Sequence, residues 1–252
     1  MAIATGSRKL AKPGRRRDPA ATRARLLQVA ISEFAAKGYS GARIDAVAAR
    51  AKVNIRMIYH YFGGKEALYI EVLEHTLAKL RADELKLDFS AMTPLDGIMQ
   101  LFDFIDGHFT DHPELMKLLS SENLNKARFM QKSAAIPMMA TPVLRLLQTL
   151  LQRGVAEGCI TTGIEPLHLY VTLVSLAYFH KSNAHTLTRI FATELLAPAW
   201  QADHKAQTRR MLLRFLSPTG SGDSLEVIAA AIKVPAVSAA TAVTAAVAEV
   251  SA

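Results

Sequence analysis

The chain has 252 residues, half of them apolar, and its 30 Lys and Arg against 22 Asp and Glu give a formal net charge of +8 at pH 7. The apolar fraction is sufficient for a sizeable core, and the single cysteine, Cys159, excludes an internal disulfide and is typical of a reducing compartment. No apolar run follows the basic N-terminal segment as in a signal peptide, and none approaches the roughly 20 residues of a membrane span. We therefore expect a cytoplasmic protein with no membrane partner.

The predicted elements are all helical, because strand-like alternation is nearly absent from the chain. Residues 1–17 are expected to be a flexible basic arm. Asp18-Pro19 is a helix-start signal, and the first helix should end near Lys37, where Gly38 stops it. Further helices are expected at 44–51, 55–62, 65–87, 94–111, 114–133, 143–157, 166–180 and 203–216. The tail from 217 to 252 begins as a Ser/Gly linker and continues rich in Ala and Val, which predicts a disordered extension.

Residues 44–68 contain the most informative pattern, two short helices separated by a tight turn. Ile44, Val47, Ala48 and Ala51 share one face of the first helix, and Ala48 is small enough to let another helix approach closely. Val53 should fill the turn. The pattern is typical of a helix-turn-helix.

The second short helix of this pattern has the character of a recognition helix. Asn54 is expected to cap it, and Ile58 and Phe62, four residues apart, should point inward. This leaves an outward set of polar and aromatic side chains: Arg56, Met57, Tyr59, His60 and Tyr61. Such a set is a poor solvent-exposed surface but fits a DNA groove.

Charge distribution favours the same interpretation independently. Residues 1–65 hold 14 Lys and Arg against three Asp and Glu, whereas the rest of the chain holds 16 against 19. The basic excess lies entirely in the part proposed to meet DNA, where phosphate neutralisation and counterion release reward it.

Residues 25–73 resemble the N-terminal domain of the TetR family of bacterial one-component transcriptional regulators. The resemblance is carried by Phe34-Ala35-Ala36-Lys37-Gly38-Tyr39, by residues 44–51, by Ile58-Tyr59-His60-Tyr61-Phe62 and by Lys65-Glu66-Ala67-Leu68. The chain departs from the family at Arg43, where Thr or Ser is usual, at Lys52, where Gly is usual, and at Gly64, where Ser or Asn is usual. Arg43 and Gly64 weaken side-chain caps, and Lys52 replaces a residue that tolerates a left-handed helix end.

The resemblance implies an all-α fold with an N-terminal three-helix helix-turn-helix head and a larger C-terminal helical domain for ligand binding and dimerisation. We accordingly predict an arm at 1–17, a DNA-binding domain at 18–65, an effector-binding and dimerisation domain at 66–216 and the tail at 217–252. The implied partners are double-stranded DNA, an unidentified small-molecule effector and a second copy of the chain, bound through C-terminal helices. The nearly all-apolar helix at 166–180 fits such a dimer interface, as does the last helix, with Met211, Leu212, Phe215 and Leu216; a monomer with both helices in its core is the alternative.

At the DNA end, Arg56 is the best candidate for a base contact, since its guanidinium can fork onto guanine. Ile55 and Met57 could touch thymine methyl groups, and Arg43 and Lys65 begin helices where phosphates can be held. The remaining candidates are Asn54, Tyr59, His60 and Tyr61, together with Arg15, Arg16 and Arg17 for a minor groove. Two bland alternatives remain, that Tyr59 is a half-buried core residue and that Lys65 is an ordinary solvated lysine.

Effector-binding residues are harder to predict, because large apolar side chains also make up any core. An apolar, Met-rich cavity could be lined by Phe102, Phe109, Met116, Phe129, Met130, Met138, Met139, Tyr170, Tyr178 and Phe179. The polar cluster His180, Asn183 and His185, at the end of an apolar helix, could orient a ligand or only cap the helix.

The sequence contains no convincing catalytic, metal or cofactor motif. Gly63-Gly64-Lys65 lacks the spacing, the following Ser or Thr and the preceding strand of a phosphate loop, and Cys159 has no paired histidine. His108 and His112 are four residues apart but have no supporting ligand. We therefore expect a ligand-responsive, sequence-specific repressor that is not an enzyme. The alternatives are an activator of the same architecture and a ligand-independent architectural DNA-binding protein.

Overall fold

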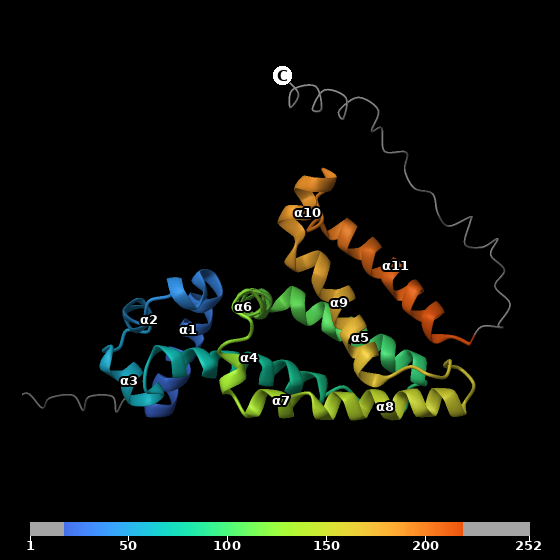
Figure 1. Ribbon diagram of the computed structural model, residues 1–252, viewed down its shortest axis with the longest axis horizontal. Coiled ribbons are helices and arrows are strands. Elements are labelled where there is room, and N and C mark those ends of the chain that lie inside the picture. The colour runs from blue at the N-terminus through green and yellow to red at the C-terminus, as the bar shows by residue number, and fades with distance from the viewer. Residues whose placement is uncertain (1–17, 219–252) are drawn as a thin grey trace, which may run out of the picture.

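The computed structural model describes residues 18–218. Within this range the chain forms eleven α-helices and one short 3-10 helix, with no strand, so the all-helical prediction is confirmed (Figure 1). None of these helices is long and apolar enough to cross a membrane. The predicted arm, with Arg15, Arg16 and Arg17, and the tail from residue 219 lie outside the described residues.

The N-terminal helices form a small head, at the left of Figure 1: α1 (Pro19–Gly41), α2 (Ile44–Arg50) and α3 (Arg56–Phe62). The Asp18 side chain accepts a hydrogen bond of 2.9 Å from the amide of Ala20, which caps α1 as predicted. Gly38, at φ 63°, interrupts α1 where the sequence placed its end, and the remaining residues to Gly41 form a further turn after the kink. The long helix α4 (Lys65–Glu84) then leads away from the head.

The body contains the remaining eight elements, five of which have a proline as their first or second residue. They are α5 (Pro94–Asp111), α6 (Pro113–Leu124), η1 (Met130–Lys132), α7 (Ala135–Met139), α8 (Thr141–Ala156), α9 (Pro166–Ser182), α10 (Ala184–Phe191) and α11 (Pro198–Leu216). Proline occupies the first turn of α5, α6, α8, α9 and α11, where its missing N–H leaves no bond unmade.

Several boundaries differ from those predicted, each for a local reason. The helix expected at 114–133 stops at Leu124, because Lys126 and Ala127 adopt positive φ angles of 56° and 55°. The last helix begins at Pro198 and not at Asp203, since Pro198 is its start signal. α4 ends at Glu84, three residues before the predicted Leu87, and the short helix α10 was not predicted.

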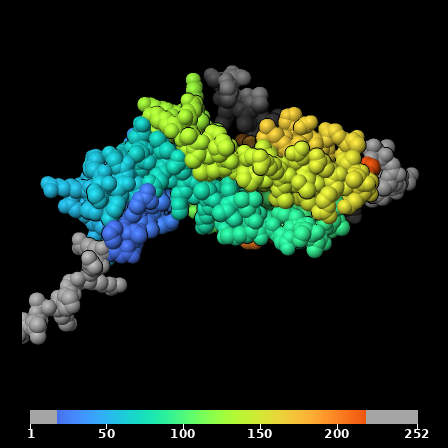
Figure 2. Space-filling view, turned by 90° about the horizontal axis from the view of Figure 1, so that it is seen from below, coloured from blue at the N-terminus to red at the C-terminus, as the bar shows by residue number. Residues whose placement is uncertain are grey.

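Buried apolar side chains form two cores, and α4 and α6 contribute to both. The first half of α4 supplies Leu68 and Val72 to the head core, and its second half supplies Leu77 to the body core. On α6, Leu118 packs into the head core and Leu115 into the body core. Figure 2 shows how α7 and α8 then continue from this junction toward the far end of the body.

Two glycines on body helices give a matched test of this packing. A Cβ added at Gly154 on α8 would lie 2.3 Å from Cδ1 of Ile160, whereas one added at Gly107 on α5 meets nothing within 4 Å. We expect Gly154→Ala to destabilise the protein by about 1–3 kcal/mol through overpacking. Gly107→Ala should be neutral or stabilise it by up to about 1 kcal/mol through lower unfolded-state entropy. Urea unfolding followed by circular dichroism measures both, and equal effects would contradict the packing described here.

Candidate functional site

The turn between α2 and α3 is a tight, hydrogen-bonded connection. The amide of Val53 donates to the Ala48 carbonyl at 3.0 Å, and Lys52 adopts a φ of 55°. Lys52 thus occupies a left-handed position that favours glycine, as its departure from the family pattern suggested. The Asn54 side chain accepts a hydrogen bond of 2.9 Å from the amide of Arg56, the first residue of α3, while Ile55 occupies the cap position itself.

Helix α3 is held by two buried side chains and exposes its charged and aromatic ones. Ile58 is fully buried and Phe62 is 7% exposed, as predicted from their spacing. Tyr59 is 55% exposed, so the alternative that it is a core tyrosine is wrong. Arg56 and His60 are also exposed, and among the described residues neither takes part in an ion pair.

The other residues predicted to contact DNA differ in how far they are exposed to solvent. Ile55 is exposed, whereas Met57 and Tyr61 are half-buried against the head core. The Nζ atom of the half-buried Lys65 lies 4.8 Å from the centre of the Tyr39 ring, a cation–π contact that holds this lysine against the head.

Arg43 is engaged by a neighbouring carboxylate. Its guanidinium donates to both carboxylate oxygens of Asp45, at 3.2 and 2.8 Å, and both side chains are exposed. Arg43 makes no side-chain cap on α2, and Gly64 makes none on α4, which confirms the weakened caps expected from the sequence. An Arg43 contact to phosphate requires the guanidinium to share or leave Asp45.

A buried carboxylate fixes α2 against α1 behind this surface. Glu33 is 3% exposed, and its oxygens accept hydrogen bonds from Lys37 Nζ at 2.7 Å and from Arg50 Nη1 at 3.2 Å. The backbone amide of Arg43 also points to it, at 3.5 Å. The bond from Lys37, helped by Arg43 and Arg50, holds the pKa of Glu33 below its usual value despite burial.

The body contains a cavity of about 900 Å³, bounded by α5, α6, the end of α9, α10 and α11. Its volume is in the range of small-molecule sites. The walls combine apolar side chains with several charged ones, and the lining residues include Asp106, Phe109, Met116, Lys117, Ser120, Leu124, Lys181, His185, Gln201 and Lys205.

Some of the predicted effector residues meet at this cavity. Phe109, Met116 and His185 line it. Tyr178 stands behind the wall, with its hydroxyl 2.8 Å from that of Ser120, and His180 Nε2 lies 3.0 Å from Oε1 of Gln201, another wall residue. Burial lowers the pKa of His180, which favours its neutral form.

The other predicted effector residues lie elsewhere: most are used for packing or capping, and two are exposed at the surface. Phe102 is 1% exposed in the body core, and Asn183 donates from Nδ2 to the Phe179 carbonyl at the end of α9. Tyr170 donates a hydrogen bond of 2.9 Å to Glu84. The rest are the junction residues Phe129 and Met130, the half-buried Met139 and the exposed Met138 and Phe179.

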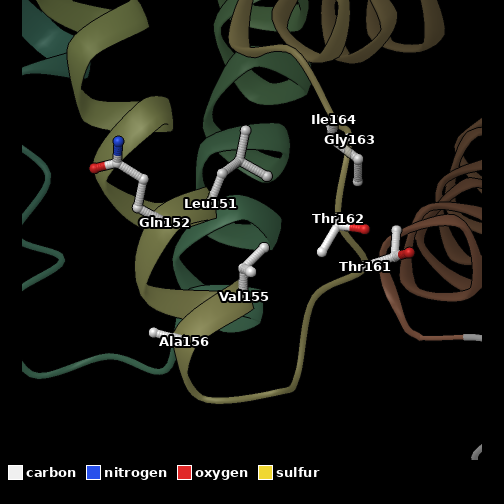
Figure 3. A pocket seen from close by; sticks show the side chains of 8 residues that line it. All are labelled: Leu151, Gln152, Val155, Ala156, Thr161, Thr162, Gly163 and Ile164. Atoms are coloured by element: carbon white, nitrogen blue, oxygen red, sulfur yellow. The ribbon is translucent and has the colours of Figure 1, made fainter.

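A second hollow, of about 370 Å³, lies between α8 and the loop before α9 (Figure 3). It is lined by Leu151, Gln152, Val155, Ala156, Thr161, Thr162, Gly163 and Ile164. No charged side chain lines it, so it offers no ionic partner to a charged ligand, and the larger cavity is the better candidate site.

Comparisons with known protein families and with known proteins found relatives of both the head and the body of this chain. Residues 26–72 match the bacterial regulatory proteins of the tetR family, and residues 94–212 match the tetracyclin repressor-like C-terminal domain. The HTH-type transcriptional repressor NicS of Pseudomonas putida is 35% identical over 182 residues, which are 72% of this chain and 86% of NicS. The HTH-type transcriptional repressor SCO4008 of Streptomyces coelicolor is 34% identical over 165 residues, 64% of this chain and 79% of that protein.

The chain belongs to the TetR family of transcriptional regulators. It is thus a DNA-binding regulator from a family that is not enzymatic. The fold agrees with the crystal structure of reduced NemR from Escherichia coli, at a TM-score of 0.56 and 22% identity, over 80% of this chain and all of NemR. The resemblance drawn from residues 25–73 is confirmed.

Sequence reasoning missed the charged residues of the TetR-type body cavity. Lys117, Lys181, Lys205 and Asp106 come from four different helices, and in the sequence each looks like an ordinary solvent-facing charged residue. Only the packing of α5, α6, α9 and α11 brings them to one wall.

The Glu33 network gives a prediction for the DNA-binding head. Glu33→Gln should lower the free energy of unfolding by about 1–2 kcal/mol at pH 7, because two half-exposed cations lose their partner. The folded-state pKa of Glu33 lies below its ordinary value of 4.5, so this stabilisation is present above that pH and is lost as pH falls through the folded pKa. Urea unfolding at pH 7 and at about pH 3 measures it.

The exposed pair Arg153–Glu157 supplies the control, and Glu157→Gln should change stability by less than about 0.5 kcal/mol. If Glu33→Gln lowered the free energy of unfolding by the same amount at about pH 3 as at pH 7, the charged role assigned to Glu33 would be contradicted.

Proposed function

We propose that this TetR-family protein is a repressor that binds a near-palindromic DNA site as a homodimer and leaves it when a small molecule occupies the body cavity. Its similarity to NicS and SCO4008, both named as transcriptional repressors, supports the repressor role. The single observation that carries the proposal is the exposed Arg56, Tyr59 and His60 on α3, on one chain with a cavity of about 900 Å³.

DNA recognition is assigned to α3. Arg56, exposed in the first turn of α3, is free to contact a guanine edge, and Ile55 and Met57 flank it for thymine methyl groups. Tyr59, His60 and Tyr61 would contact sugar and phosphate, as would Asn54, Arg43 and Lys65 at the helix starts. The basic excess in residues 1–65 supports this division of roles.

Dimerisation through α9 and α11 is supported by apolar side chains that the single chain leaves exposed. On α9, Leu167 and Val171 are 54% exposed and Phe179 is 58% exposed, and these residues follow one another at multiples of four. On α11, Met211 and Phe215 are four apart and 53% and 55% exposed. Apolar stripes of this kind on two helices are typical of an interface, and a second copy would cover them.

The proposed switch runs from the cavity to the head through α6. Met116 and Ser120 line the cavity, whereas Leu118, on the same helix, is fully buried in the head core. A Cβ at Gly38 of α1 would lie 3.4 Å from Oγ of Ser121, so α6 and α1 are in close contact. A ligand that favours another position of α6 would therefore change the position of the head relative to its partner.

The experiment that tests the proposal is selection of genomic fragments by the purified protein at near-physiological salt, followed by sequencing. A near-palindromic motif would support a specific regulator. Binding without a motif would favour the architectural alternative and contradict the proposal.

Substitution of Arg56 tests the assignment of the recognition helix. Arg56→Ala should weaken binding to the selected site by about 1–3 kcal/mol and relax the preference at one base position, because a bidentate contact is lost. The exposed Arg210 on α11 supplies the control, and Arg210→Ala should leave both unchanged. Fluorescence anisotropy with single-base variants of the site measures this, and unchanged affinity and preference in Arg56→Ala would refute the assignment.

Substitution of Phe179 tests the dimer. Phe179→Glu should convert the dimer to a monomer, because a charge in an apolar interface loses its hydration without gaining a partner. Gln148→Glu on the exposed side of α8 introduces the same charge away from α9 and α11 and should leave the dimer intact. Analytical ultracentrifugation distinguishes the two states, and a dimeric Phe179→Glu variant would place the interface elsewhere.

A further inference from the structure

The chemistry of the cavity wall narrows the class of effector, an inference that rests on the proposed function. One part of the wall is apolar and includes Phe109, Met116, Leu124, Leu196 and Pro198. This part can contact the hydrocarbon portion of a ligand, but it does not distinguish a charged ligand from a neutral one.

The other part of the wall carries Lys181, Lys205 and Asp106, which belong to a network of cations and carboxylates that extends beyond the lining residues to Asp103 and Arg209. Lys181 Nζ, 6% exposed as a side chain, donates to the carboxylate of Asp106 and, at 3.1 Å, to its backbone carbonyl. Lys205 Nζ lies 3.2 Å from Asp103 Oδ1 and 3.3 Å from Asp106 Oδ2. Arg209 donates to the other oxygen of Asp103. Three cations therefore share two carboxylates.

Lys117 adds a further positive charge at the same cavity. It is exposed on α6, and among the described residues no acidic side chain lies within ion-pair distance of it. Asp106 is the only acidic residue among those that line the cavity, and its carboxylate already faces both Lys181 and Lys205. Among the lining residues three lysines therefore face one carboxylate, and the nearby Asp103, which pairs with Lys205, is also shared with Arg209.

An excess of cations beside an apolar wall favours a ligand with a negative charge over a neutral ligand of the same shape. Burial lowers the pKa of Lys181 despite Asp106, which indicates that its carboxylate partner does not fully offset the loss of water. An incoming anion would supply negative charge beside these cations, and the adjoining apolar wall strengthens the Coulombic attraction relative to bulk water.

We propose that this cavity binds an organic anion, with its carboxylate beside Lys117 and Lys205 and its apolar body against Phe109 and Met116. Lys181 is held by Asp106 and adds to the positive electrostatic potential at the wall. A neutral compound of the same shape gains the apolar contacts but not the ionic ones, so it binds more weakly.

The test uses matched acids and amides and needs no DNA. Isothermal titration of the full-length protein at about pH 7.5, where carboxylates are ionised, compares octanoate with octanamide and 2-naphthoate with 2-naphthamide. At least one acid should bind about tenfold more tightly than its amide, the gain expected of a charge-assisted hydrogen bond.

Two variants identify the cations responsible. Lys117→Gln removes a side chain without an acidic partner, and Lys205→Gln leaves Asp103 with Arg209 and Asp106 with Lys181, so both variants should fold. Each should lower the affinity for the acid and leave that for the amide unchanged. The control is Lys79→Gln, an exposed lysine on α4 outside the cavity, which should alter neither.

The outcomes separate this inference from the proposed function. Equal affinities for acid and amide, no binding of either acid at millimolar concentration, or an acid preference that survives the Lys117→Gln/Lys205→Gln double substitution would each overturn the anion site. Anisotropy with the selected DNA is then measured separately with the same compounds. Acid binding without DNA release supports the anion site and counts against the effector role, whereas release by the amides alone supports the switch and counts against the anion site.

Discussion

The packing of Phe129 between Tyr39 and Tyr69 joins the head of this molecule to its body. Its ring lies 4.1 Å from that of Tyr39 and 5.1 Å from that of Tyr69, and Tyr69 in turn contacts Phe34 at 4.8 Å. The segment after α6 is fixed there by Glu122, whose Oε2 accepts the amides of Phe129 and Met130 at 3.2 and 3.1 Å. Because α6 also lines the cavity, the same helix borders the cavity and, through the segment that follows it, contacts the head.

The opposite end of α4 is fixed by a second buried group. Glu84 is fully buried, accepts a hydrogen bond from Arg81 at 2.5 Å and another from the Tyr170 hydroxyl at 2.9 Å, and so ties α4 to α9. Burial raises the pKa of this carboxyl, while Arg81 and Tyr170 oppose the rise. α4 is therefore held at the head by its own apolar residues and at the body by a polar network. In the proposed dimer, α9 would carry that network next to the partner.

The head was predictable because its signals are local. Asp18-Pro19, Gly38, the apolar spacing of α2 and the pair Ile58 and Phe62 each act within one or two helical turns, and each took the predicted role. The effector residues were not predictable in the same way. Phe102, Phe109 and Phe129 cannot be told apart from the sequence. In the structure Phe102 lies in the body core, Phe109 lines the cavity and Phe129 joins the head to the body. Which of these positions a phenylalanine occupies depends on contacts between helices far apart in the chain.

The sequence by itself determined the family, the helical class, the position of the short helix α3 and the concentration of positive charge in residues 1–65, since all of these depend on spacing and composition along a short stretch. Only the tertiary structure decided that Lys65 lies over Tyr39 and that Lys117, Lys181 and Lys205 share one cavity with Asp106. Helix packing decides these pairings, because a side chain's neighbours across an interface depend on how the helices cross and not on its own sequence neighbours.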